Sequence, residues 1–252
     1  MERGEGTRAA RGAGGSDHGG PVRPDADALA RHLPAGTAGY CVGLLSEGPL
    51  AGVRVDVRVV ASRRTKVGDH RGPGRGRPAH RITLNEDLNP YAFLTTLLHE
   101  VAHALTWERH VRGRSRFARR VLPHGPQWKG EFSRILAPLV GDGSLPPDVS
   151  AALARSLRDP RAATCSDRGL VEALSRYDAP DPSRVRVEDL PVGAAFRIDG
   201  RRAFRKGAKL RSRYRCYDAV TGVEYRVHAL CPVVPCAAEG PQRVSPPGRR
   251  RA

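Results

Sequence analysis

The chain has no pair of cysteines in CxxC spacing, no long apolar run and few lysines. Its five cysteines are irregularly spaced and odd in number, which argues against a structural zinc ribbon and against a secreted disulfide scaffold. No stretch approaches the ~18 apolar residues that span a bilayer, and the N-terminus lacks the apolar core of a signal peptide. We therefore expect a soluble cytoplasmic protein with reduced thiols.

The scarcity of lysine weakens the net positive charge as evidence for nucleic-acid binding. Only four of the 43 basic residues are lysines, and the formal net charge is +17. The sequence pI of about 10.8 exceeds the ~9 that prompts a search for a nucleic-acid surface. So strong an arginine bias is also what a GC-rich genome produces without any nucleic-acid partner. The distribution of charge is therefore better evidence than its total.

Five residues, HEVAH from His99 to His103, have the order and spacing of a catalytic zinc motif. Histidines four residues apart lie ~40° apart around a helix of ~3.6 residues per turn, so both imidazoles reach one ion. Glu100 lies where a carboxylate can take a proton from a water held by zinc without binding the metal itself. The alternative is a chance HExxH on a core helix with two hydrogen-bonded histidines.

The helix around the motif is indicated independently. Asn89 followed by Pro90 is a helix N-cap followed by a favoured first helical residue, and no Gly or Pro recurs before Gly113. Apolar residues at helical spacing predict a broad buried side formed by Phe93, Leu94, Leu97, Leu98, Val101 and Leu105.

A catalytic zinc usually takes three protein ligands and leaves a fourth position open. A metzincin site is excluded, because Met1 is the only methionine and the positions expected to hold Gly and His hold Thr106 and Arg109. We favour His124, which lies in a Gly- and Pro-rich turn before a second predicted helix. Glu131 and His110 remain alternatives.

The pairing of HEVAHALTW with a downstream HGPQWK resembles the SprT-like metallopeptidases, as do the preceding RTKVGDHRG and HRITLNEDLNPYAFLTTLL. The resemblance covers about residues 25–140 and implies a zincin-like domain that holds zinc on His99, His103 and His124, with Glu100 as general base. It also implies a link to proteolysis of proteins bound or crosslinked to DNA. The chain departs from the many family members that end in a four-cysteine zinc ribbon.

The chain is expected to be α+β, with disordered tails at 1–24 and 237–252, a metallopeptidase domain at 25–140 and a helical linker at 141–184. In the first domain, 53–60 and 80–84 read as strands. Asp148 and Asp167 are expected to cap the two linker helices. Short apolar runs at 185–236, with turns at Gly200 and Gly222, predict a small antiparallel β domain. A similar ribbon-free segment occurs in a subset of SprT-like proteins.

Four basic residues of the β domain alternate with other side chains: Lys209, Arg211, Arg213 and Arg215. A single strand here would project one basic face, which suits contacts to a phosphate backbone. The alternative is a solvated strand edge kept soluble by arginine.

We therefore expect a zinc-dependent metallopeptidase that acts on a protein substrate and that DNA recruits through this basic face. One alternative is a nucleic-acid-binding protein whose metalloprotease-like domain is structural or inactive. Another is a zinc-dependent hydrolase of a non-peptide substrate, because fold and motif define the chemistry better than the substrate.

Overall fold

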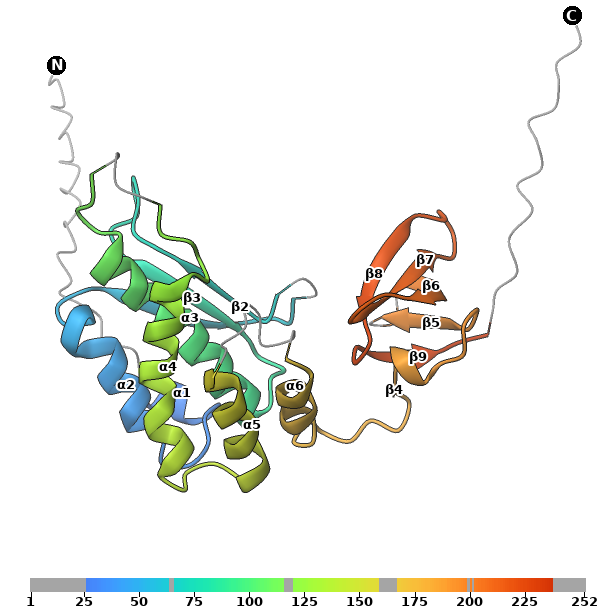
Figure 1. The fold of residues 1–252 in the computed structure, drawn as a ribbon, viewed down its shortest axis with the longest axis horizontal. Helices are drawn as coiled ribbons and strands as arrows, with labels where there is room; N and C mark the ends of the chain where they lie inside the picture. Colours follow the sequence, from blue (N-terminus) through green and yellow to red (C-terminus); the bar gives the residue numbers. More distant parts are fainter. Residues whose placement is uncertain are drawn as a thin grey trace, which may run out of the picture.

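The computed structural model describes residues 26–63, 66–115, 120–158, 167–198, 200 and 202–237. Apart from Ala237, both tails predicted to be disordered lie outside these residues. The chain forms a body of helices and strands and a second body of strands, which confirms the α+β class (Figure 1). Among the described residues, no helix combines the length and apolar character that crossing a bilayer requires.

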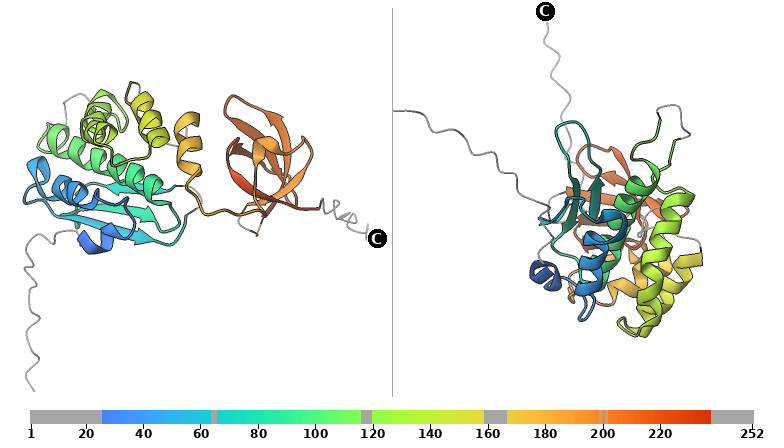
Figure 2. Two further views of the ribbon diagram at one scale, coloured as in Figure 1. Left: turned by 90° about the horizontal axis from the view of Figure 1, so that it is seen from below. Right: turned by 90° about the vertical axis from the view of Figure 1, so that its left-hand side faces the viewer.

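Within the described residues, the first body contains six α-helices and a three-stranded sheet. Its elements are α1 (Ala26–Ala30), α2 (Ala38–Ser46), a 3-10 turn (Gly48–Leu50), β1 (Val55–Val60), β2 (Gly68–Arg71), β3 (His80–Asn85), α3 (Pro90–His110), α4 (Pro126–Gly141), α5 (Pro147–Arg158) and α6 (Arg168–Ser175). Helix α3 lies over one face of the sheet, and α4 and α5 lie beyond it (Figure 2).

Helix α3 begins where the sequence predicts. The Asn89 side chain accepts hydrogen bonds from the backbone N–H groups of Tyr91 and Ala92, at 3.1 and 3.0 Å, which satisfies donors that the first helical turn leaves free. The six apolar residues predicted to form its buried side are all buried, none more than 1% exposed. The HEVAH motif therefore lies in the middle of a well-anchored helix.

The sheet has the order β1-β3-β2. Strand β3 pairs in parallel with β1 and antiparallel with β2, so β2 forms an edge. Ile82 and Leu84 of β3 are fully buried, as expected of alternate residues on the side that faces a core. The resemblance to SprT-like proteins predicts a strand in RTKVGDHRG, whereas apolar periodicity does not, because the β2 sequence GDHR has no apolar residue.

Helices α5 and α6 pack into the same hydrophobic core as α3 and α4. Leu153 and Leu170 are 1% and 2% exposed, and the amide of Asn89, the N-cap of α3, donates to the Leu174 carbonyl of α6 at 3.0 Å. Asp167 caps α6 as predicted. The Asp148 carboxylate instead binds the Tyr177 hydroxyl at 2.8 Å. The segment predicted as a linker therefore helps to build the body that carries the HEVAH helix.

The second body is one six-stranded antiparallel sheet of order β4-β9-β5-β6-β7-β8, curled around its own core (Figure 1). Its elements are β4 (Val185–Arg186), a 3-10 turn (Val187–Asp189), β5 (Ala195–Ile198), β6 (Arg202–Lys209), β7 (Arg213–Asp218), β8 (Glu224–His228) and β9 (Pro232–Pro235). Gly200 and Gly222 have φ of 72° and 69°, the left-handed conformation that their predicted turns require.

Candidate metal centre

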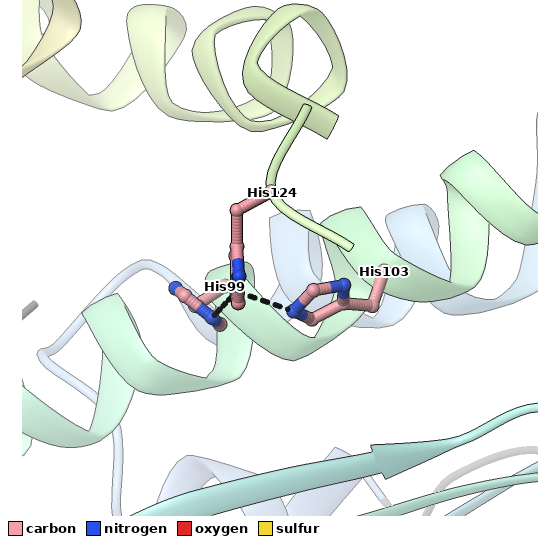
Figure 3. Close-up of side chains that lie close together, drawn as sticks. All are labelled: His99, His103 and His124. Carbon is pink, nitrogen blue, oxygen red and sulfur yellow. Dashed lines mark hydrogen bonds between the residues drawn. The ribbon is translucent and has the colours of Figure 1, made fainter. Parts of the chain in front are cut away.

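Three histidines from two elements meet on one side of α3 (Figure 3). His99 and His103 project from adjacent turns of the helix, and His124 comes from the turn that precedes α4. His124 Nε2 lies 3.2 Å from His99 Nε2 and 3.1 Å from His103 Nε2. The structure thus brings together the three ligands favoured from the sequence.

The three Nε2 atoms are better arranged to bind one cation than to form hydrogen bonds with one another. Burial, aided by the charge of neighbouring histidines, lowers the pKa of His99 to about 3 and that of His103 to about 4. A neutral imidazole carries only one N–H, so three converging Nε2 atoms present lone pairs that they cannot all pair. Tetrahedral Zn²⁺ with bonds of ~2.0–2.1 Å places its ligand nitrogens about 3.3 Å apart. The observed separations fit this donor set.

Trp128 supports the three rings from α4. Its ring centroid lies 4.6 Å from that of His99 and 4.8 Å from that of His124, and its indole N–H donates to the His99 carbonyl at 3.4 Å. The side chain is fully buried and stacks on Phe132. This packing brings the start of α4, and therefore His124, onto the HEVAH helix.

Glu100 is buried against the edge strand β2, with 6% of its surface exposed. Burial, aided by the charge of Asp69, raises its pKa to about 8, although a backbone hydrogen bond from His70 and two nearby cations oppose the rise. A Cβ atom on Gly68 would lie 2.5 Å from Glu100 Oε1, so only glycine permits this approach of the strand. A cation on the neighbouring histidines would favour the ionised carboxylate.

A buried chain of polar side chains, not predicted from the sequence, ends beside the three histidines. Glu108 Oε1 lies 2.9 Å from His80 Nε2, and His80 Nδ1 lies 2.8 Å from His70 Nε2. The His70 ring stacks parallel to that of His103, with centroids 6.0 Å apart. Burial lowers the pKa of both His70 and His80. With both rings neutral, His80 donates to the carboxylate and His70 donates to His80, which ties β2 and β3 to α3.

The two alternative ligands lie elsewhere. Glu131 is buried on α4, where its carboxylate is 2.7 Å from an Arg134 nitrogen and 3.4 Å from Arg109 Nε. His110, the last residue of α3, lies 3.8 Å from the same carboxylate. Both belong to an ion-pair cluster that joins α3 to α4, and neither is part of the histidine cluster.

The predicted basic strand is a hairpin in the structure, so that prediction was wrong. Lys209 ends β6, Arg211 lies in the turn, and Arg213 and Arg215 lie on β7. All four are exposed. The alternation that predicts one strand continues through the turn, because residues 210–212 contain no Gly, Pro or Asn to mark it.

The outer face of this hairpin is nevertheless basic. Arg215 lies directly opposite Arg226 of β8, and Arg205 of β6 lies opposite Tyr217 of β7, whose ring is 38% exposed. Like charges placed opposite each other across antiparallel strands are destabilising. Glu224 offsets part of this repulsion from 3.8 Å.

The chain matches no family model, no curated protein and no solved structure. The functional argument therefore rests on the residues of the site and on their geometry.

Proposed function

We propose that the chain is a zinc-dependent metallopeptidase of SprT-like type, with His99, His103 and His124 as zinc ligands. The observation that supports it most is the convergence of three neutral Nε2 atoms at 3.1–3.2 Å, with a buried carboxylate on the adjacent residue. A structural zinc site is usually closed by four protein ligands, whereas three ligands beside a general base are typical of hydrolytic sites.

Each residue then has a separate role. Zinc, when bound, supplies a Lewis acid for the scissile carbonyl and makes water acidic enough to react. Glu100 accepts the proton of the attacking water and returns it to the leaving amine nitrogen as the C–N bond breaks. The backbone N–H of His70 and the close approach of Gly68 hold the Glu100 carboxylate in place.

Metal analysis of two purified variants tests the ligand assignment. His124→Ala should lose most of its zinc, because two histidines leave an incomplete shell. Glu131→Ala, which removes the buried carboxylate that pairs with Arg109 and Arg134, should keep it. Full zinc occupancy in the His124 variant would overturn the assignment.

Cleavage of an unfolded protein substrate tests the activity. Glu100→Gln should retain about one equivalent of zinc while hydrolysis falls ~100-fold or more, as expected for a lost general base. Zinc binding by the unmodified protein without any cleavage would favour the nucleic-acid-binding alternative. Hydrolysis of small esters but not of peptides would favour a non-peptide substrate.

A second function is supported by the outer face of the second body. We propose that Arg213, Arg215 and Arg226 bind the phosphate backbone of DNA and so recruit the enzyme to proteins on DNA. The opposition of Arg215 and Arg226 favours a bound anion, since an anion relieves their repulsion. The exposed ring of Tyr217 adds a platform on which a base can stack.

Fluorescence anisotropy with labelled single-stranded DNA at several salt concentrations tests this surface. Replacing the three arginines by Ser should weaken binding and lower the log–log salt slope by about 2, at ~0.7 per lost contact. A control with the same charge change, in which exposed Arg31, Arg58 and Arg155 of the first body become Ser, should keep the slope. Equal effects of the two triple variants would refute a specific surface.

A further inference from the structure

A cavity of about 270 Å³ opens beside His103. One wall is the face of α3 that carries Thr106 and Trp107, and the opposite wall includes Leu122 and Pro123 from the segment leading to His124. Residues three and four positions after a helical residue lie on its side of the helix, so this wall continues the surface that bears the metal ligand. The cavity and the histidine cluster are therefore adjacent parts of one cleft.

The wall on the strand side is shaped by glycine. A Cβ atom on Gly72 would lie 2.9 Å from Trp107 Cδ1, so the chain after β2 lies directly against the Trp107 ring. His70, at the end of the buried polar chain, lines the cavity next to this contact. This wall is therefore formed by the packing of Gly72 against Trp107 and by the hydrogen-bonded side chain of His70.

Of the ten described residues that line the cavity, seven have an apolar side chain or none, and none of the ten carries a carboxylate, ammonium or guanidinium group. Its polar side chains are two histidines and Thr106, whose hydroxyl already donates to the Ala102 carbonyl at 2.7 Å. Val111 and Leu122 at the rim are 37% and 59% exposed, so apolar surface faces solvent beside a polar site. A charged group entering here would lose hydration without gaining an ionic partner among these ten lining residues.

The size of the cavity limits its occupant. An apolar protein cavity of about 150 Å³ binds benzene, so the volume of about 270 Å³ accommodates one large aliphatic or aromatic side chain. Binding pockets for whole small molecules run from about 300 to 1,000 Å³. The occupant that fits is one side chain of a polypeptide whose backbone crosses the neighbouring histidine cluster.

We infer that this cavity is a specificity pocket, which binds a large apolar side chain of the substrate next to the scissile bond. The inference rests on the proposed peptidase function and names its substrate class. Large apolar side chains are mostly buried in folded proteins. The enzyme therefore acts on unfolded or locally unfolded segments, where such residues are accessible.

Cleavage of a matched peptide series tests the preference. Peptides that differ only at one position, occupied by Phe, Leu, Ala, Asp or Lys, are incubated with the zinc-loaded protein, and product masses locate the broken bond. The Phe and Leu peptides should be cut beside that residue with kcat/KM about 10-fold or more above the Ala peptide. Equal rates across the series, or a preference for Asp or Lys, would overturn the inference while leaving the peptidase function intact.

A binding measurement decides the question even if no peptide is cleaved. The protein has two tryptophans, so its NMR spectrum contains two indole N–H signals, which Trp107→Phe assigns. The Trp107 signal should shift on titration with N-acetyl-phenylalaninamide and not with N-acetyl-alaninamide. The Trp128 signal, from the indole that donates to the His99 carbonyl, serves as internal reference.

Variants at the rim distinguish binding in the cavity from unspecific changes of the Trp107 signal. Val111→Asp and Leu122→Ser should each abolish the Trp107 shift, because they place a polar group where the ligand is desolvated. Val59→Asp on β1 is the matched control, since Val59 and Val111 are both 37% exposed, and it should leave the shift unchanged. The pocket would be refuted if neither ligand shifts the Trp107 signal, or if N-acetyl-phenylalaninamide shifts it equally in the unmodified protein and in all variants.

Discussion

Replacing Glu100 by Gln should stabilise the metal-free protein, and the gain should grow with pH. Burial raises the pKa of this carboxyl from 4.5 to about 8. Between these values the unfolded chain is ionised while the folded carboxyl retains its proton. The free energy of unfolding therefore falls as pH rises from 4.5 to about 8. Glutamine has no charge to bury and escapes this loss.

The size of the gain follows from the same linkage. At ~1.36 kcal/mol per pKa unit, the free energy of unfolding of the Glu100→Gln variant should exceed that of the unmodified protein by about 4 kcal/mol at pH 8 and by about 1 kcal/mol at pH 5. Adding zinc should shrink the difference at pH 8, because a cation on the adjacent histidines favours the ionised carboxylate.

Urea unfolding monitored by tryptophan fluorescence, with chelator present, measures this difference. Trp107 and Trp128 lie on α3 and α4, so the signal reports on the body that contains the site. Glu131→Gln is the matched control, because Glu131 is also 6% exposed but is paired with Arg134 and Arg109. That variant should lose stability at both pH values. Equal free energies of unfolding for Glu100→Gln and the unmodified protein at pH 8 would show that Glu100 is not buried as a neutral carboxyl.

Three other predictions concern the same site. In the Glu100→Gln variant, zinc affinity measured by chelator competition should stay nearly constant from about pH 8 to pH 6, because the pKa of both helix histidines is held at about 4 or below. In the unmodified protein it should fall over this range, because zinc favours the ionised Glu100 carboxylate, whose pKa is about 8 without metal. Gly68→Ala should keep zinc but lower turnover, since its Cβ atom would displace Glu100; unchanged turnover in a cleavage assay would contradict this. His80→Phe should lower the free energy of unfolding in urea by about 1–3 kcal/mol, because the buried Glu108 loses a partner, whereas His32→Phe, which alters a ring stacked on Phe93, should have a smaller effect.

Local features of the chain could be read from the sequence because their energetics involve only neighbouring residues. The Asn89 cap, the buried side of α3 and the positive φ of Gly200 and Gly222 all follow from a few adjacent positions. The joint projection of His99 and His103 is equally local, since helical geometry alone sets their spacing.

The third ligand required the tertiary structure. His124, Glu131 and His110 were all compatible with the sequence, and their difference lies in how α4 packs on α3. Trp128 is fully buried under the three rings, which places the preceding turn over the helix. The spacing of residues along α3 cannot predict that His124 approaches it, because this approach is decided by the burial of Trp128, an apolar side chain from a distant segment.

The edge strand and the basic hairpin were also decided by tertiary structure. His70, His80 and Glu108 belong to three elements and meet only after β2 pairs with β3 and the sheet packs on α3. In the second body, the alternating basic residues from Lys209 to Arg215 fit one strand as well as a hairpin, because alternation continues through an unmarked turn. Periodicity and caps act within a few residues, whereas strand pairing and the approach of separate elements depend on which apolar faces the whole chain can bury together.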